Sequence, residues 1–126
     1  MKDTLFYLGL AMLLTHEMDA MLNHEWLVLP LTSFLTDPVG QRVFLLGHIP
    51  LFALLIGLIA SLNLKLRARA RFWTSAFLVI HAGLHTLFSG RASYEFASLD
   101  SSLLIYGAAL VGAAYLVVVH REQPTE

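Results

Sequence analysis

Four apolar stretches, each long enough to cross a lipid bilayer as a helix, constrain this chain more than any other feature of its sequence. They run over about residues 4–24, 38–62, 71–88 and 99–119. At about 1.5 Å per residue, roughly 20 helical residues cross the hydrocarbon of a membrane. The connections are short, which favours antiparallel neighbours. We therefore predict an all-α integral membrane protein, a four-transmembrane-helix bundle that forms a single domain over residues 1–126.

The balance of apolar and charged residues agrees with this fold class and excludes several functions. Hydrophobic residues make up 57% of the chain and charged residues 13%, about half the charged share of an average soluble domain. The formal net charge of −1 leaves no basic footprint, so we expect no nucleic-acid partner. Cysteine is absent, which excludes disulfides, thiolate metal sites and cysteine nucleophiles.

Basic residues are concentrated in one connection and predict how the bundle is oriented. The connection between the second and third stretches carries Lys65, Arg67, Arg69 and Arg71. Each of the other two connections carries a single arginine, Arg42 or Arg91. The positive-inside rule places the basic connection in the cytoplasm, and four helices then place the N- and C-termini there too. We expect the chain in a bacterial inner (cytoplasmic) membrane.

Histidine recurs inside three of these stretches at a similar depth. Counted from the cytoplasmic ends of their helices, His16 lies about 18 Å, His81 about 15 Å and His85 about 21 Å into the membrane. His48 lies about 15 Å below the outer edge, and Gly47 beside it is expected to permit a close helix approach. Each such side chain is costly to insert without a partner, so a shared partner is expected.

Helical positions indicate which of these groups could act together. His81 and His85 are four residues apart, the spacing that lets two imidazoles of one helix reach one metal ion. Asp19 follows His16 by three residues on the same helix face. Glu17 points about 100° away from His16, so it is expected to be either an outer neighbour of the site or one member of a separate pair.

A metal site in the middle of the membrane is the chemistry that these residue types predict. The candidate ligands come from three helices and are His16, His48, His81 and His85. Zinc suits three neutral histidines, iron suits histidine with carboxylate, and haem between two facing histidines is a weaker alternative to either ion. Asp19 or Glu17 is the expected general base. A buried polar network without metal and a proton path stay open as alternatives.

One motif resembles a known group of proteins. His16-Glu17-Met18-Asp19, followed by His48-Ile49-Pro50 and His81-x-x-x-His85, is similar to small bacterial integral membrane proteins of unknown function that share an HxxEE-type motif. Asp19 stands where the motif has its first glutamate, and Ala20 where it has its second. The likeness covers the first three helices and implies no activity. A looser similarity, in site chemistry alone, is to membrane hydrolases that bind zinc through three histidines near an aspartate.

The preferred function is a metal-dependent membrane hydrolase, with zinc favoured over iron. Its substrate is expected to be a lipid or another amphiphile that enters sideways from the outer leaflet. In this hypothesis the ion is held by His48, His81 and His85, with His16 as a fourth ligand or a positioning group. Asp19 activates the water.

Two other functions use the same residues. A non-enzymatic subunit that carries metal or haem is suggested by the small-residue face of the fourth helix. There the spacing of Ala108 and Gly112 predicts a homo- or hetero-oligomer. A non-haem iron oxidoreductase is the third possibility, although too few histidines are present for two irons held only by histidine boxes.

Two loop segments are expected away from the site. His24-Glu25-Trp26 is placed at the outer water interface, where Trp26 is interpreted as a headgroup anchor and Glu25 has no assigned role. Tyr94-Glu95 is interpreted as part of a solvated loop. Neither segment is therefore expected in the mid-membrane layer.

Overall fold

The computed structural model describes residues 1–122, and its regular structure in that range is entirely helical, without a strand. In chain order the elements are α1 (Lys2–Leu22), the 3-10 helix η1 (Glu25–Leu27), α2 (Asp37–Ile59), α3 (Leu64–Phe88), α4 (Leu99–Ser102), the π-helical η2 (Leu103–Gly107) and α5 (Ala108–Arg121). The last three form one continuous helix. The all-α prediction is confirmed for these residues. Residues 123–126 of the predicted domain lie outside the described part.

Three helices are long and apolar enough to cross a membrane, namely α1, α2 and the continuous helix Leu99–Arg121. Helix α3 is not among them, because basic residues fill its first turns and two histidines interrupt its apolar second half. Large apolar side chains are exposed along the outside of α2, including Leu46, Ile49 and Leu54. A surface of this kind requires an apolar environment, as expected for a membrane protein.

The basic segment lies within α3, not in the connection where we predicted it. The third helix begins at Leu64, seven residues before the predicted start at residue 71. The side chain of Asn63 accepts hydrogen bonds from the backbone N–H groups of Lys65 and Leu66, which caps the helix. Lysine, arginine and leucine favour helix once it is started. The basic segment therefore continues as helix.

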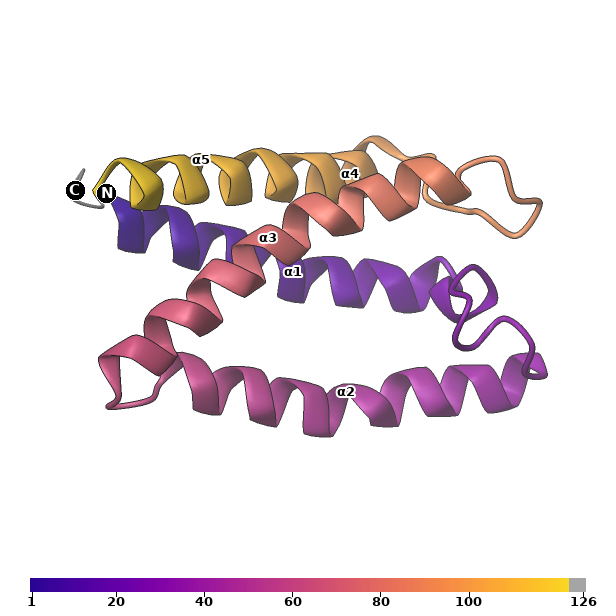
Figure 1. The fold of residues 1–126 in the computed structure, drawn as a ribbon. Helices are drawn as coiled ribbons and strands as arrows, with labels where there is room; N and C mark the ends of the chain where they lie inside the picture. Colours follow the sequence, from indigo (N-terminus) through magenta and orange to yellow (C-terminus); the bar gives the residue numbers. More distant parts are fainter. Residues whose placement is uncertain (123–126) are drawn as a thin grey trace.

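The long helices pack in a crossed arrangement. Figure 1 shows α1 and α5 side by side and antiparallel, with α3 crossing them diagonally and contacting both. Helix α2 lies opposite α1 and is joined to the rest mainly through α3 and η1. Both ends of the described chain meet at one end of the bundle, where Lys2 forms an ion pair with Glu122. Residues 1 and 122 therefore lie at the same end of the bundle.

The small residues of the last helix are used inside the chain. Ala108 and Gly112 are buried where α5 meets α3. A Cβ atom on Gly112 would lie 2.7 Å from the carbonyl oxygen of Ser75 and 3.1 Å from Cβ of Leu78. Oligomerisation through this face stays a prediction, but the structure already occupies these positions. The predicted close approach at Gly47 is wrong, since a Cβ there would meet no atom within 4 Å.

Candidate metal centre

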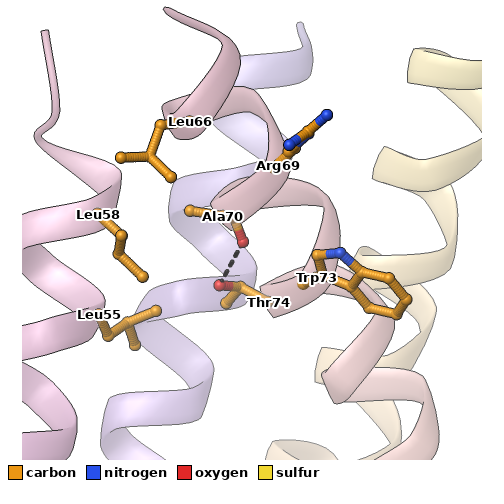
Figure 2. Close-up of a pocket in the computed structure, with 7 residues that line it drawn as sticks. All are labelled: Leu55, Leu58, Leu66, Arg69, Ala70, Trp73 and Thr74. Carbon is orange, nitrogen blue, oxygen red and sulfur yellow. Dashed lines mark hydrogen bonds between the residues drawn. The ribbon is translucent and has the colours of Figure 1, made fainter. Parts of the chain in front are cut away.

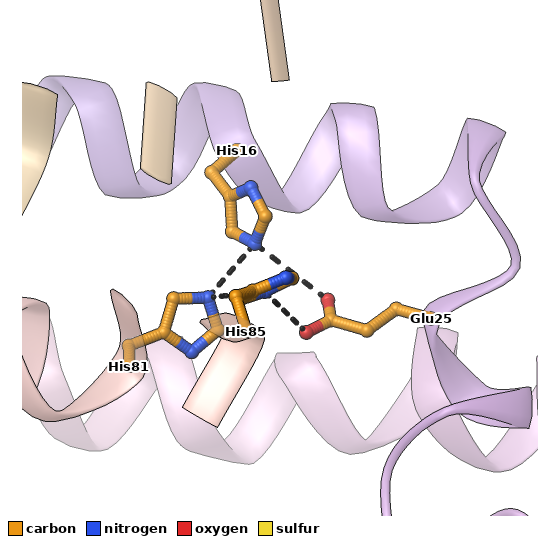
Figure 3. Close-up of side chains that lie close together, drawn as sticks. All are labelled: His16, Glu25, His81 and His85. Carbon is orange, nitrogen blue, oxygen red and sulfur yellow. Dashed lines mark hydrogen bonds and ion pairs between the residues drawn. The ribbon is translucent and has the colours of Figure 1, made fainter. Parts of the chain in front are cut away.

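Three histidines and one glutamate from distant parts of the sequence converge in the interior, as Figure 3 shows. Nε2 of His81 lies 2.9 Å from Nε2 of His16 and 3.1 Å from Nε2 of His85. The Glu25 carboxylate closes the group, with Oε1 at 3.3 Å from His85 Nε2 and Oε2 at 3.8 Å from His16 Nε2. All four ligand atoms lie within 4.8 Å of one another.

Two long helices deliver the histidines from fixed positions. His16 lies on the face of α1 that meets α3, and His81 and His85 occupy successive turns of one face of α3. Residues four apart in a helix lie above one another, which is why both α3 rings reach the same point. The three histidines that we predicted to lie close together therefore do so in the structure.

The glutamate reaches the group because the chain reverses after α1. The helix ends at Leu22, and His24 adopts a left-handed conformation with φ of 49°. This conformation is uncommon for residues other than glycine, and it turns η1 back against α1. Glu25 is the first residue of η1, and its side chain points toward the histidines.

Side-chain bonds to the backbone hold the segment after η1 in place. The Thr32 hydroxyl donates to the Trp26 carbonyl at 2.8 Å. From the last connection, the Arg91 guanidinium donates to the Val28 carbonyl at 2.6 Å and the Ser93 hydroxyl donates to the Leu27 carbonyl at 3.3 Å. Two connections far apart in the sequence are thereby tied together around Glu25.

The contacts among the rings exceed the hydrogen bonds that imidazoles can make. An imidazole nitrogen has one in-plane position, which holds either a proton or a lone pair. Nε2 of His81 is within hydrogen-bond distance of two other Nε2 atoms, those of His16 and His85, yet can bond to only one. One of the two contacts at His81 is therefore left without a hydrogen bond. A cation among the three ring nitrogens would bind their lone pairs by coordination.

All four side chains of this group are buried, so a bound ion would stabilise polar atoms that water does not reach. The exposed fractions are 1% for His16, 2% for Glu25, 4% for His85 and 8% for His81. Burial by itself raises the pKa of the Glu25 carboxyl, but the hydrogen bond with His85 and the charges of His16 and His81 outweigh it and hold this pKa below its ordinary value. The carboxylate is therefore ionised near neutral pH and available as a ligand.

The distances suit a tetrahedral transition-metal ion. Bonds of about 2.0–2.1 Å place neighbouring ligands of a tetrahedral zinc ion about 3.3 Å apart. Four of the six separations, at 2.9, 3.1, 3.3 and 3.8 Å, lie on both sides of this value, the last two being to different oxygens of Glu25. Three ring nitrogens with one carboxylate oxygen form a donor set that zinc and non-haem iron both accept.

Aromatic side chains from the last connection surround the histidine group. The ring of Phe96 packs edge-on to His85, with centroids 4.7 Å apart, and lies 5.7 Å from the ring of His16. The Tyr94 hydroxyl lies 3.3 Å from Nδ1 of His85, the nitrogen that does not face the other ligands. Burial raises the pKa of Tyr94. Tyr94 is thus a half-buried, neutral partner that orients His85, whereas Glu95 beside it is exposed.

His48, one of the three histidines predicted to hold the ion, is not in this group. Its Nδ1 donates to the Phe44 carbonyl at 2.6 Å, and its Nε2 lies 2.9 Å from Oε2 of Glu17. Glu17 is about 100° around α1 from His16, so it faces α2 while His16 faces α3. Of the two roles foreseen for Glu17, the structure shows membership of a separate pair. One proton lies between Nε2 of His48 and Oε2 of Glu17, whether the pair is imidazole with carboxylic acid or imidazolium with carboxylate.

Asp19, the other predicted general base, lies beside the group without entering it. Its Oδ1 accepts a hydrogen bond from the Asn23 side chain at 2.9 Å. Its Oδ2 is buried without a hydrogen-bond partner among the described residues, and so is Nδ1 of His16 one turn earlier. Asp19 is therefore placed to influence His16 electrostatically, and Glu25 is the carboxylate that meets the rings.

Sequence reasoning missed Glu25 and misplaced Trp26. The count of 1.5 Å per residue assumes a continuous helix, which the reversal at His24 breaks. Trp26 is 1% exposed, so the prediction of a headgroup anchor is wrong. Its indole N–H donates to Asp37 at 2.7 Å. Its ring packs directly on Gly40, where a Cβ atom would be only 2.8 Å from the ring. Asn23 before His24 was the available signal for a helix end.

Comparison with known proteins finds a family but no described activity. The family described as "Family of unknown function (DUF6713)" matches residues 2–122, which include all the helices and the four converging residues. No curated protein and no solved structure matches the chain.

Proposed function

This chain belongs to the family of unknown function DUF6713, and we propose that it is a membrane protein built around one divalent transition-metal ion. The proposed ligands are His16, Glu25, His81 and His85. The observation that supports this most directly is the double short contact at Nε2 of His81, of which a hydrogen bond accounts for only one. Zinc is preferred to iron because four protein ligands at tetrahedral spacing match its usual geometry.

In the membrane we propose four spans, with α3 as the fourth and both termini in the cytoplasm. The basic first turns of α3 support this orientation, because they would lie at the cytoplasmic surface of a bacterial inner membrane. The similarity to HxxEE-type proteins stays a prediction. It concerns His16 and Asp19, of which only His16 is a proposed ligand.

Hydrolysis of a lipid or another amphiphile is the reaction that we propose for this centre. A bound zinc ion would lower the pKa of water toward 7 and polarise a carbonyl group. Glu25 is better placed as general base than Asp19 or Glu17, because its carboxylate faces the rings. It lies on the three-residue η1 and not on a long helix, so it is the ligand most able to yield its position to water.

An open groove supports entry of the substrate from the side. It has a volume of about 200 Å³ and lies between α1 and α2, where the Glu17–His48 pair is its polar element; its lining is Leu14, Glu17, Met18, Met21, Phe44, Leu45, His48 and Phe52. In this proposal the groove holds the apolar part of the amphiphile. Phe44, which lines the groove, also belongs to the apolar cluster that contains Trp26, the residue after Glu25.

A specific observation also favours a non-enzymatic role. All four ligands come from the protein and are almost fully buried, as in metal sites that stabilise a fold. A metal-carrying subunit of a larger complex is therefore the second candidate. Haem is disfavoured, because the short contacts among the three rings leave no room for a porphyrin between any facing pair. One ion site among residues 1–122 likewise gives no support to a two-iron oxidoreductase.

Metal content and lipid turnover separate these candidates. Protein purified in detergent should contain one zinc ion per chain by elemental analysis. After reconstitution with phospholipid, a hydrolase should release fatty acid or headgroup, stop when dipicolinate removes the zinc, and recover when zinc is restored. Stoichiometric zinc without turnover would favour the non-enzymatic candidate, and protein without any transition metal would contradict both.

Acidification should release the metal with a steep pH dependence. Each histidine must be deprotonated to bind, and the ordinary imidazole pKa is about 6.5. The pKa of Glu25 lies below its ordinary value, so this carboxylate stays ionised as the histidines take up protons. Zinc affinity should therefore fall on acidification by more than about tenfold per pH unit once protons bind the imidazoles, since three ligands compete with protons.

The measurement is competition with a zinc-binding dye from pH 8 down to the pH at which zinc is released, corrected for the dye's own protonation. A loss that never exceeds tenfold per pH unit would contradict coordination by three imidazoles. A slope of one would indicate that a single histidine binds.

A further inference from the structure

We propose a binding site for one anionic phospholipid between α2 and α3, at the end of the bundle remote from η1. The site is a pocket of about 280 Å³, shown in Figure 2, whose lining is Leu55, Leu58, Leu66, Arg69, Ala70, Trp73 and Thr74. An acyl chain occupies the apolar part, and Arg69 binds the lipid phosphate. None of the proposed metal ligands lines this pocket, so the site is independent of the metal centre.

The walls of the pocket suit an acyl chain. Leucines from α2 and α3 face each other across it in Figure 2. The one hydroxyl in the wall belongs to Thr74 and donates to the Ala70 carbonyl at 2.8 Å, so it is already satisfied. A satisfied hydroxyl presents little polarity to its surroundings. The interior of the pocket therefore attracts hydrocarbon.

The charge at the entrance is positive and available to a ligand. Within residues 1–122, Arg71 forms an ion pair with Asp3, and its Nη2 also donates to the Tyr7 hydroxyl at 2.9 Å. Over the same residues no carboxylate forms an ion pair with Lys65, Arg67 or Arg69. Only Arg69 of these three lines the pocket. Its guanidinium can bind a phosphate through two parallel hydrogen bonds.

Trp73 places the lipid headgroups at the level of Arg69. Trp73 lies one turn after Arg69 and is 66% exposed. Tryptophan prefers the boundary between headgroups and hydrocarbon, so Arg69 lies among the phosphates and Leu55 of α2 lies on the hydrocarbon side. Lys65, Arg67 and Arg69, which have no carboxylate partner within residues 1–122, disfavour a lipid that carries its own ammonium group. The occupant is therefore a diacyl lipid with net negative charge, such as phosphatidylglycerol.

The test uses fluorescence quenching by lipids brominated on their acyl chains. The protein is reconstituted in phosphatidylcholine vesicles with small fractions of brominated phosphatidylglycerol or brominated phosphatidylcholine. The brominated phosphatidylglycerol should quench Trp73 at a lower mole fraction than the brominated phosphatidylcholine, with a preference of about fivefold. Trp73→Phe should remove this quenching, because Trp26 is 1% exposed.

Matched variants separate a site from a diffuse attraction. Arg69→Gln should abolish most of the preference, whereas Lys65→Gln removes the same charge outside the pocket and should reduce it less. Ala70→Leu fills the pocket and should weaken quenching by both brominated lipids, whereas Ala68→Leu on the exposed face of the same helix should not. Equal effects of the two charge variants, or no preference for the anionic lipid, would overturn the proposal.

Discussion

Replacing Glu25 by glutamine should lower the zinc affinity of the purified protein by at least about 100-fold, while His48→Gln should leave it unchanged. The loss should exceed the roughly 10- to 100-fold cost of removing an outer partner of a metal ligand. Glutamine keeps the size of Glu25 and removes the negative charge that faces His16 and His85. His48 contacts Glu17 instead, and glutamine can preserve a hydrogen bond to that carboxylate.

Elemental analysis and dye competition measure both variants. Size and helical content are measured in parallel and the affinities are compared for folded protein, because removing one partner of a buried ion pair destabilises a fold. Loss of zinc in His48→Gln with retention in Glu25→Gln would instead support the ligand set expected from sequence. A zinc ion that survives His81→Ala combined with His85→Ala would exclude both sets.

Replacing Gly112 by alanine should destabilise the helix packing by about 1–3 kcal/mol. The added methyl group would be 2.7 Å from the Ser75 carbonyl oxygen, which belongs to helix backbone and cannot rotate away. Either α5 or α3 must shift, and these two helices form a large part of the core with Leu78 between them. The histidines of α3 are carried by the same helix, so zinc affinity should fall as well.

The matched control is Gly57→Ala in α2, where a Cβ atom meets nothing within 4 Å. Alanine is favoured over glycine inside a helix by about 0.5–1 kcal/mol, so this variant should be as stable as wild type or more stable. Reversible unfolding in mixed micelles with increasing dodecyl sulfate, followed by circular dichroism, measures both. Equal stability of the two variants would contradict the close approach of α5 and α3.

Much of the site could be predicted because it depends on distances along single helices. The i,i+4 spacing of His81 and His85 and the depth count for His16 follow from a rise of about 1.5 Å and a turn of about 100° per residue. These three predicted ligands lie together in the structure. His48 passed the same depth test, but depth does not specify which neighbour a helix face meets.

The fourth ligand could not be predicted in this way because it depends on a reversal of the chain. Glu25 follows His16 by nine residues, and in a continuous helix it would lie about 13 Å further along the axis. The left-handed His24 and the packing of Trp26 against Gly40 bring it back. Such packing depends on residues from a different helix, which no local periodicity records.

The sequence by itself determined the helical class and the spacing of the histidines along their helices, and three of its four predicted spans are long and apolar enough to cross a membrane. Local geometry and the cost of exposing backbone in lipid are sufficient for these conclusions. The tertiary structure decided that Glu25 and not His48 completes the group. That choice depends on how α2 and η1 are rotated against α1, and the contacts of Trp26 and Glu17 that set this rotation join residues that no single-helix pattern relates.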